Sequence, residues 1–456
     1  MNGKQYQIQN GTLVDITPKI AALNGGKAYT GIDPVVIDNV NDTIALAEAY
    51  TPLGDTIYVA TTGSDTNDGK TAATAVRTIT KALEIARGVF AANSGATDLR
   101  TIYRLVDIRI AAGTYAGDLN TSGLRVQMTL LGNVTVNGDF FASSASACII
   151  TGNYAFSVNG QVLADGTTSL HFGCKTVNVA YSGTDNALVC GGGAFIYADT
   201  NCTSFTITAT NAGRAIQSNS SSPIVLSPTV NIVANNIDSC VGVYEGGSVQ
   251  FEGALNISGT GCVHLFDLNN KSYITLGSNF TASDIVTGMA ISCYVGCTIK
   301  NYGIANFYSN TNEVAIVLTN NCSLMNYGSI TVNGKSTAYA NIYCGPNSTF
   351  MNYFGSSLTI NSTVAHTSAV TIEGGTLWFD GSSSLSISGS YTGGIISCGI
   401  NGIVVVAASV TVTNNATGAR YHVNYGGQIS TVGAGAYRLP GSADGWIDSV
   451  SYGYYS

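Results

Sequence analysis

The chain has 456 residues, of which 10% are charged, and a formal net charge of −8. A charged fraction this far below the usual ~25% is typical of membrane proteins, or of stacked β-sheets covered by Ser, Thr and Asn. The sequence has no apolar run of the ~18 residues that a membrane helix needs and no basic patch, which argues against membrane insertion and against a nucleic-acid partner.

The charged residues are concentrated near the N-terminus. Residues 1–120 hold 10 of the 18 basic and 12 of the 26 acidic side chains. The remaining 336 residues are therefore nearly uncharged. An uncharged polar surface is suited to neutral glycans or to another protein, and the net negative charge disfavours polyanions.

Residues 1–55 do not share the period found later in the chain. The stretch KAYTGIDPVVIDNVNDTIAL, residues 27–46, predicts two short strands on either side of a bend. This segment is too short for a core of its own, so we expect it to attach to another chain or to the rest of this one. The first residues form neither a charged n-region nor an apolar h-region, so we expect no signal peptide and folding in a reducing cytoplasm.

Residues 56–120 predict a strand, a loop rich in Gly and Asp, and then an amphipathic helix at about 76–92. Ile79, Leu83, Ala86 and Phe90 are three or four residues apart and form one apolar face of this helix. Two strands that end at glycine follow the helix.

Residues 121–425 repeat at intervals of about 21 to 28 residues, most regularly from about residue 204, as short strands with alternating apolar residues. One apolar column of the repeat runs through Tyr244, Phe266, Cys293, Leu318, Cys344, Ile372, Cys398 and Val423. A second runs through Ile207, Ile232, Ile257, Phe280, Phe307, Val332, Ile360, Ile387 and Val412. This periodicity predicts an all-β parallel β-helix, or β-solenoid, of about a dozen turns and on the order of 60 Å long.

Three successive turns contain the segments IKNYG, LMNYG and FMNYF. Their asparagines, Asn301, Asn326 and Asn352, are 25 and 26 residues apart, so we expect the side-chain amides to hydrogen-bond from one turn to the next. The tyrosines that follow them should stack in the same way.

The order of strand, loop, helix and glycine-closed strand resembles the beginning of pectate-lyase-like right-handed β-helix proteins. The residues that match the motif are Tyr58, Val59, Gly63, Ser64, Asp65, Asp68, Gly69, Thr78, Ile79, Ala82, Gly113, Thr114 and Tyr115. The resemblance implies a right-handed β-helix whose N-terminal end is capped by the α-helix, and it implies no particular chemistry.

Both ends of the chain resemble tailed-phage fibre proteins. The resemblance covers about residues 27–46 and the tail at 426–456, which is rich in Gly and Tyr and is expected to cap the last coil. It implies a homotrimeric tail-fibre or tailspike protein, assembled in the host cytoplasm and located in the virion tail. Its N-terminal segment would then attach to other tail or baseplate proteins.

All 11 cysteines lie at or beyond Cys148, and no CxxC motif occurs. Several of them occupy apolar positions of the repeat, so we expect free, buried thiols and no zinc site. Cofactors are not expected either.

Pectate-lyase-like folds include polysaccharide lyases and hydrolases, so acidic residues are the candidates for catalysis. Between Lys271 and Arg420 the acids are only Asp284, Glu313, Glu373 and Asp380, too dispersed for a calcium site. Glu245 and Asp267 each follow a first-column residue, so we expect them to stack on adjacent turns as a catalytic pair. The alternative is two solvated acids beside Lys271.

A binding surface is the better-supported site. Tyr302, Tyr327 and Tyr353, with Asn326, offer aromatic rings and amides of the kind that bind sugars. Alternatively, these tyrosines pack between chains of an oligomer. We therefore expect a receptor-binding protein for a bacterial surface polysaccharide, with a polysaccharide depolymerase or a purely structural virion shaft as alternatives.

Overall fold

The structure, a computed structural model, describes residues 6–9, 12–15, 35–38, 43–46, 56–92, 105–282, 285–309, 314–335, 340–448 and 454–455. The chain divides into two compact units. The first unit, Met1–Thr51 with Thr97–Arg104, contains two antiparallel strand pairs, β1 (Tyr6–Gln9) with β2 (Thr12–Asp15) and β3 (Val35–Asp38) with β4 (Thr43–Leu46). The second pair confirms the two strands predicted in this segment.

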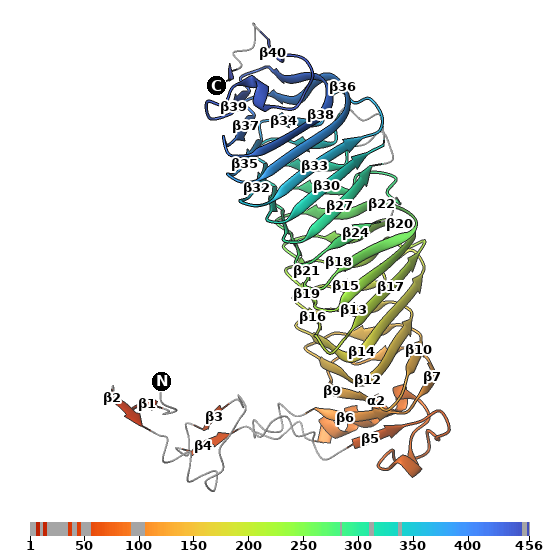
Figure 1. Ribbon diagram of the computed structural model, residues 1–456. Coiled ribbons are helices and arrows are strands. Elements are labelled where there is room, and N and C mark those ends of the chain that lie inside the picture. The colour runs from red at the N-terminus through yellow and green to blue at the C-terminus, as the bar shows by residue number, and fades with distance from the viewer. Residues whose placement is uncertain are drawn as a thin grey trace. The chain divides into compact units, whose positions relative to one another are not determined.

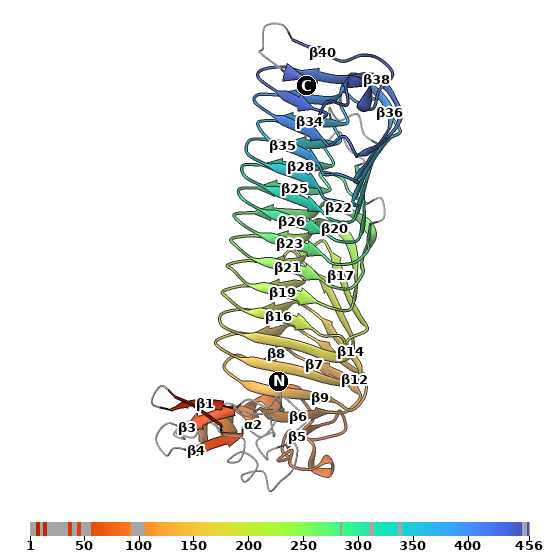
Figure 2. The ribbon, with the colours of Figure 1, turned by 60° about the vertical axis from the view of Figure 1, so that its left-hand side comes forward.

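The second unit, Pro52–Ala96 with Leu105–Ser456, is a right-handed parallel β-solenoid of about 13 turns, as predicted (Figure 1). Each turn, or rung, contributes strands to three parallel sheets, called A, B and C here, and the strands of each sheet lie one above another along the solenoid (Figure 2). Within the described residues, no helix is long and apolar enough to cross a membrane.

Sheet A consists of β5 (Thr56–Val59), β6 (Val106–Ile110), β9 (Arg125–Leu130), the first parts of β12 (Ala147–Asn159) and β14 (Ser169–Ser182), β16 (Phe195–Ala198), β19 (Pro223–Leu226), β21 (Ser248–Phe251), β23 (Tyr273–Leu276), β26 (Thr298–Asn301), β29 (Ser323–Asn326), β32 (Thr349–Asn352), β35 (Thr376–Phe379), β37 (Ile403–Val406), β39 (Gln428–Ser430) and β41 (Tyr454–Tyr455).

Sheet B consists of β7 (Gly113–Ala116), β10 (Val134–Asn137), the second parts of β12 and β14, β17 (Ser204–Thr210), the first parts of β20 (Thr229–Val243) and β22 (Leu255–Asn269), β24 (Phe280–Ala282), β27 (Ile304–Ser309), β30 (Ser329–Gly334), β33 (Ser357–Ser362), and the first parts of β36 (Ser384–Gly399) and β38 (Thr411–Val423).

Sheet C consists of β8 (Leu119–Asn120), β11 (Phe140–Ala142), β13 (Val162–Ala164), β15 (Leu188–Cys190), β18 (Arg214–Ser218), the second parts of β20 and β22, β25 (Ile291–Tyr294), β28 (Ile316–Thr319), β31 (Ile342–Cys344), β34 (Val370–Glu373), the second parts of β36 and β38, and β40 (Trp446–Ile447).

The helix α2 (Ile79–Ala92) covers the N-terminal end of the solenoid and packs against β5, β6 and β8. Leu83 is buried and Phe90 packs on the core, as the predicted apolar face requires. The helix begins three residues later than predicted. The carboxylate of Asp65 accepts the backbone N–H groups of Arg77 and Thr78, both at 2.9 Å, and the Thr78 hydroxyl accepts the N–H of Lys81 at 3.1 Å, so Thr78 caps the first turn.

The interior of the solenoid is a continuous apolar core in which side chains stack on their equivalents in the next rung. Rings from different sheets also pack on one another across the interior: Phe140, Phe156, Phe172 and Phe205 form one buried series, with ring centroids 5.5–6.5 Å apart. Each rung therefore buries its apolar side chains against its two neighbours, which is how a solenoid acquires stability without a second layer. All eleven cysteines are buried and free, in agreement with the prediction.

The strand register confirms the predicted first column from Cys293 onward. The predicted column is wrong at its first two positions, Tyr244 and Phe266. Cys293 pairs with Leu268, and Leu268 with Val243, whereas Phe266 pairs with Ile291. These strands carry buried apolar residues on both sides of the correct position, so apolarity alone did not determine the alignment.

The second column is likewise correct except at Phe280 and Val412. Phe280 pairs with Leu255 rather than with Ile257, and Val412 pairs with Leu385 rather than with Ile387. In β24 two apolar residues two positions apart point inward, and the prediction took Phe280 although Ala282 pairs with Ile257. In β38 the partner of Ile387 is the polar Asn414, which an apolar column could not identify.

The described residues 426–448 and 454–455 continue the solenoid through η2 (Ala436–Arg438) and the short strands β39, β40 and β41. Leu439 is buried, and the indole of Trp446 stacks on His422 with the ring centroids 4.6 Å apart. Tyr437 and Trp446 remain partly or largely exposed in the single chain, and the cap predicted for residues 426–456, in one chain or across several, stays a prediction.

Candidate functional site

The tyrosines predicted to bind glycans form one stack on the side of the solenoid, which we call the tyrosine strip: Tyr302, Tyr327 and Tyr353. Each directly follows a sheet A strand. The ring centroids are 4.9 and 4.3 Å apart, with interplanar angles of 6° and 10°. Tyr302 is 48% exposed and Tyr327 is 36% exposed, so the strip faces outward.

Because the rings stack on one another, both faces of Tyr327 are covered. A sugar ring could stack only on the two outer faces of the strip, on Tyr302 or Tyr353, or meet the ring edges and hydroxyls. Burial of its hydroxyl and contact with the Tyr353 hydroxyl raise the pKa of Tyr327 to about 12. The hydroxyl therefore stays protonated at neutral pH and can act as a hydrogen-bond donor.

The predicted asparagine ladder is present, and it lies inside the solenoid. Asn301 donates from Nδ2 to Oδ1 of Asn326 at 2.9 Å, and Asn326 donates in the same way to Asn352 at 2.9 Å. All three side chains are buried, and Asn326 also donates to the carbonyl of Ser357. Asn326 would therefore act on a glycan only by positioning Tyr327, the next residue.

Further outward-facing side chains of sheet A lie beside the strip. Lys300, Met325, Met351 and Trp378 are register partners on four successive rungs. Trp378 is 40% exposed, and the Lys300 ammonium lies 5.4 Å from the centroid of the Tyr273 ring. The sequence prediction did not include Trp378, although its spacing from Met351 would have placed it in the same column.

The two candidate catalytic carboxylates are not register partners, which corrects the predicted stacking. Asp267 in β22 pairs with Gly242 and Ser292 on the adjacent rungs. Glu245 lies in the turn that follows β20, with φ of 53°, and its carboxylate accepts the Ser220 hydroxyl at 3.0 Å. The error follows from the misaligned first column, in which Tyr244 and Phe266 were treated as equivalent.

Asp267 is instead hydrogen-bonded to a tyrosine. The Tyr244 hydroxyl donates to Oδ2 of Asp267, and Arg214 donates from Nε to the Tyr244 hydroxyl oxygen at 3.0 Å. The guanidinium of Arg214 also lies over the Tyr244 ring, 4.7 Å from its centroid. A Cβ at Gly242 would lie 2.4 Å from Cδ of Arg214, so glycine leaves the space that this arginine occupies. Burial, and then the bond to Asp267, raise the pKa of Tyr244.

A cavity of about 310 Å3 adjoins this cluster and is lined by Arg214, Gln217, Asn219, Tyr244, Glu245 and Asn270. Glu245 thus faces a cavity that Asp267 does not line. Glu252, which follows in sequence, lies beyond β21 in sheet A and bonds to Ser227 at 2.6 Å. The structure does not bring these acids together around one space, whereas glycoside hydrolysis uses two carboxyl groups on either side of one bond.

The lyase candidates also lie apart. Glu373 accepts the Tyr343 hydroxyl at 3.0 Å, and Asp380 follows β35 in sheet A; Asp284 and Glu313 lie outside the described residues. Among the residues that the structure describes, no group of three or more His, Cys, Asp or Glu side chains is arranged to hold a metal ion.

The fold is a parallel β-solenoid, consistent with the predicted resemblance to pectate-lyase-like β-helix proteins, and residues of the matching segment have structural roles in it. A Cβ at Gly63 would lie 2.4 Å from the carbonyl oxygen of Ala75, which explains the glycine at that position. Comparisons with models of known families, with curated proteins and with solved structures find no match to this chain.

Proposed function

We propose that this protein attaches a phage tail to its host by binding a bacterial surface polysaccharide along the side of the solenoid. The observation that supports this proposal is the tyrosine strip, because a row of ordered, outward-facing aromatic residues with partly exposed rings is suited to sugar rings. The resemblance of both chain ends to phage fibre proteins supports a location in the virion tail, in a homotrimer anchored through residues 1–55.

Binding of the fluorescently labelled protein to host cells, and to polysaccharide purified from them, tests this function. The triple variant Tyr302→Ala, Tyr327→Ala, Tyr353→Ala should lose most of the binding. The matched control replaces three exposed aromatic residues elsewhere, Tyr154, Tyr437 and Trp446, by alanine and should bind as the unmodified protein does. If both triple variants bind equally well, the strip does not carry attachment.

A second candidate function is depolymerisation of the same polysaccharide. The observation that favours it is the cavity in which Glu245 lies beside Arg214 and Tyr244, because it joins a carboxylate to groups that can bind a sugar. Incubation with the polysaccharide should then release new reducing ends or unsaturated uronates, and Glu245→Gln should abolish the release. A lack of product from every host polysaccharide would exclude this function and leave binding alone.

A further inference from the structure

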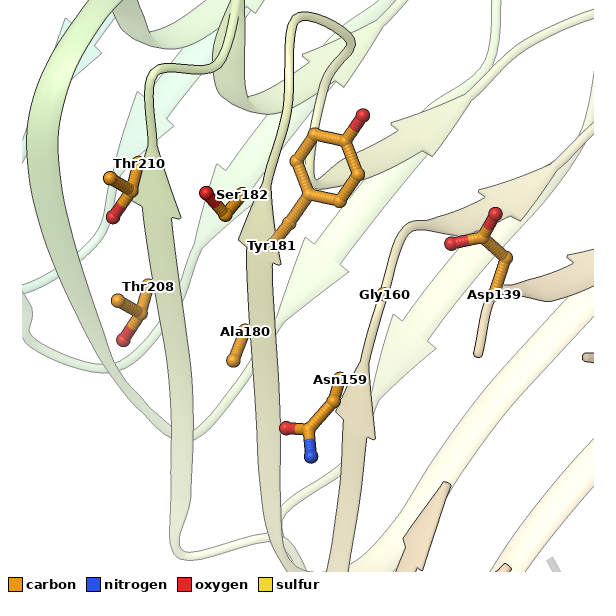
Figure 3. A pocket seen from close by; sticks show the side chains of 8 residues that line it. All are labelled: Asp139, Asn159, Gly160, Ala180, Tyr181, Ser182, Thr208 and Thr210. Atoms are coloured by element: carbon orange, nitrogen blue, oxygen red, sulfur yellow. The ribbon is translucent and has the colours of Figure 1, made fainter. Parts of the chain in front are cut away.

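A groove lies on the side of the solenoid where sheet B turns into sheet C, far in sequence from the tyrosine strip. It has a volume of about 580 Å3, within the ~300–1,000 Å3 range of small-molecule sites. Its lining residues are Asp139, Asn159, Gly160, Ala180, Tyr181, Ser182, Thr208 and Thr210 (Figure 3).

The groove arises from a change in the length of the rungs. β10 ends at Asn137 and β12 at its register partner Asn159, but β14 continues past the equivalent Ala180 to Ser182, and β17 continues to Thr210. Two longer strands thus extend beyond the point where the two shorter ones turn away. In the view of this step in Figure 3, Tyr181 lies between Ser182 and the turn at Gly160, and Asp139 lies beyond that turn.

The ring of Tyr181 is held in place in this step. It packs against the core while remaining partly exposed, and its hydroxyl oxygen accepts the backbone N–H of Asp185 at 3.3 Å. A Cβ at Gly183 would lie 2.7 Å from that oxygen, so the glycine leaves room for the ring. An aromatic face fixed before binding lowers the conformational entropy that a ligand must overcome.

Several polar atoms around the ring have no protein partner within the described part of the chain. Asp139 accepts the N–H of Gln161 with Oδ1 at 2.7 Å, which leaves Oδ2 available, and Asn159 donates to Asn137 at 2.7 Å, which leaves its Oδ1 available. The hydroxyls of Ser182 and Thr208 make no hydrogen bond among the described residues. The groove therefore offers acceptors and hydroxyl donors next to an aromatic ring, which matches the adjacent hydroxyls and apolar C–H face of a pyranose.

The charge of the groove restricts the ligand. Asp139 is the one carboxylate in the lining, no Lys or Arg lines the groove, and Asp118 lies next to Asp139, whose N–H it accepts at 2.9 Å. Two neighbouring carboxylates at a groove whose lining residues include no Lys or Arg would repel uronates, sialic acids and phosphorylated sugars. We propose that this groove is a second saccharide site, specific for uncharged pyranose residues. The inference rests on the proposed function, because it takes the solenoid to be a glycan-binding protein.

Calorimetric titration of the intact protein with hexasaccharides of dextran, galactan and mannan, and with hexagalacturonate, tests the site. At least one neutral hexasaccharide should bind, and hexagalacturonate should not bind at the groove. Tyr181→Ala should weaken the binding of the neutral hexasaccharide by about tenfold or more, equivalent to ~1.4 kcal/mol. The matched control Tyr154→Ala removes an exposed tyrosine of the neighbouring strand β12 and should leave the affinity unchanged.

Because Tyr181 also packs on the core, a second variant tests the site without disturbing the fold. Ser182→Ala with Thr208→Val removes two hydroxyls that make no internal hydrogen bond, and it should weaken the same interaction about tenfold. Asp139→Asn should retain neutral binding and allow hexagalacturonate to bind.

The outcomes separate this site from the proposed function. If the groove variants bind saccharide as the unmodified protein does, while the triple variant of the tyrosine strip loses binding, the groove is not a site and the proposed function stands. If hexagalacturonate binds the groove of the unmodified protein better than the neutral sugars do, the ligand class is wrong. If the protein binds neither these saccharides nor host polysaccharide, both proposals fail.

Discussion

The side-chain amide of Asn326 donates to Oδ1 of Asn352 across 2.9 Å in the interior of the solenoid. The column is apolar on either side of the ladder, because Leu276 pairs with Asn301 and Phe379 pairs with Asn352. The three asparagines thus form a polar segment of an apolar column, in which each amide bonds to the next and Asn301 and Asn326 also donate to backbone carbonyls.

We expect Asn326→Ala to lower the free energy of unfolding by about 1–3 kcal/mol, because it leaves a buried amide oxygen of Asn352 without its donor. Chemical denaturation followed by circular dichroism measures the change. Asn361→Ala is the matched control: Asn361 bonds to Asn333 at 3.1 Å in a similar ladder on the partly exposed surface, and its loss should cost within ~0.5 kcal/mol. Equal effects of the two substitutions would contradict a special role for the buried ladder.

Asp267→Asn should also destabilise the protein, by about 1.5–3 kcal/mol, because Asp267 accepts the hydroxyl of the half-buried Tyr244. Glu245→Gln should change the stability by less than ~0.5 kcal/mol, since its carboxylate contacts a surface hydroxyl. Tyr244→Phe should cost about as much as Asp267→Asn, and the double variant should cost less than the sum of the two. Additive losses would show that the two residues act independently.

Stability should fall at alkaline pH because the buried thiols resist ionisation. Burial raises the pKa of Cys148 from 9.0 to about 12 and has the same effect on Cys344 and Cys398. Above pH 9 the unfolded chain releases these protons while the folded chain retains them, so the unfolded state is favoured. The contribution of these protonated thiols to the free energy of unfolding is complete below pH 9 and is lost as the pH rises toward 12.

Urea denaturation midpoints measured from pH 7 to pH 11 test this expectation. Replacement of Cys148 by alanine should reduce the slope of unfolding free energy against pH by up to ~1.4 kcal/mol per pH unit, the contribution of one proton. Midpoints that do not change between pH 9 and pH 11 would contradict burial of the thiols. A thiol reagent at neutral pH should label all 11 cysteines only after unfolding.

Light scattering should give three times the chain mass of 47.0 kDa, as the phage-fibre resemblance predicts. Ile400 and Tyr425 are exposed at equivalent turns on successive rungs near the C-terminal end, with positive φ angles. If such side chains lie between the chains, Ile400→Asp should favour the monomer, and its backbone conformation suits Asp better than Ile. Leu131→Asp, at an exposed site near the N-terminal end, should leave the mass unchanged. A monomeric unmodified protein would exclude the trimer.

The β-helix, its capping helix and the asparagine ladder were predictable because each depends on local periodicity. A strand reveals its inward face through alternation, and a helix through apolar residues three or four apart. The exact register was less accessible, since Leu255 and Ile257 both point inward and either can align with Phe280 by composition alone. The stacking of Glu245 on Asp267 failed because the first column began at Tyr244 and Phe266, whereas Asp267 pairs with Gly242, three residues before Glu245.

The groove at Tyr181 was not predicted, although one sign of it was present in the sequence. Val136, Val158 and Val179 are 22 and 21 residues apart, and the next step, to Ile207, is 28. A longer repeat predicts only that some segment is extended. Which strands lengthen, and which side chains then surround the step, depends on pairing between residues more than twenty positions apart.

The isolated ladder also limits how such a rod can change in length during evolution. Rungs with apolar interiors are interchangeable, so one can be duplicated or deleted while its neighbours close the gap. The rungs of Asn301, Asn326 and Asn352 are different, since moving one of them alone among apolar neighbours would strand a buried amide. We therefore expect insertions and deletions to occur on either side of this block, which would be inherited as one piece with its tyrosine strip.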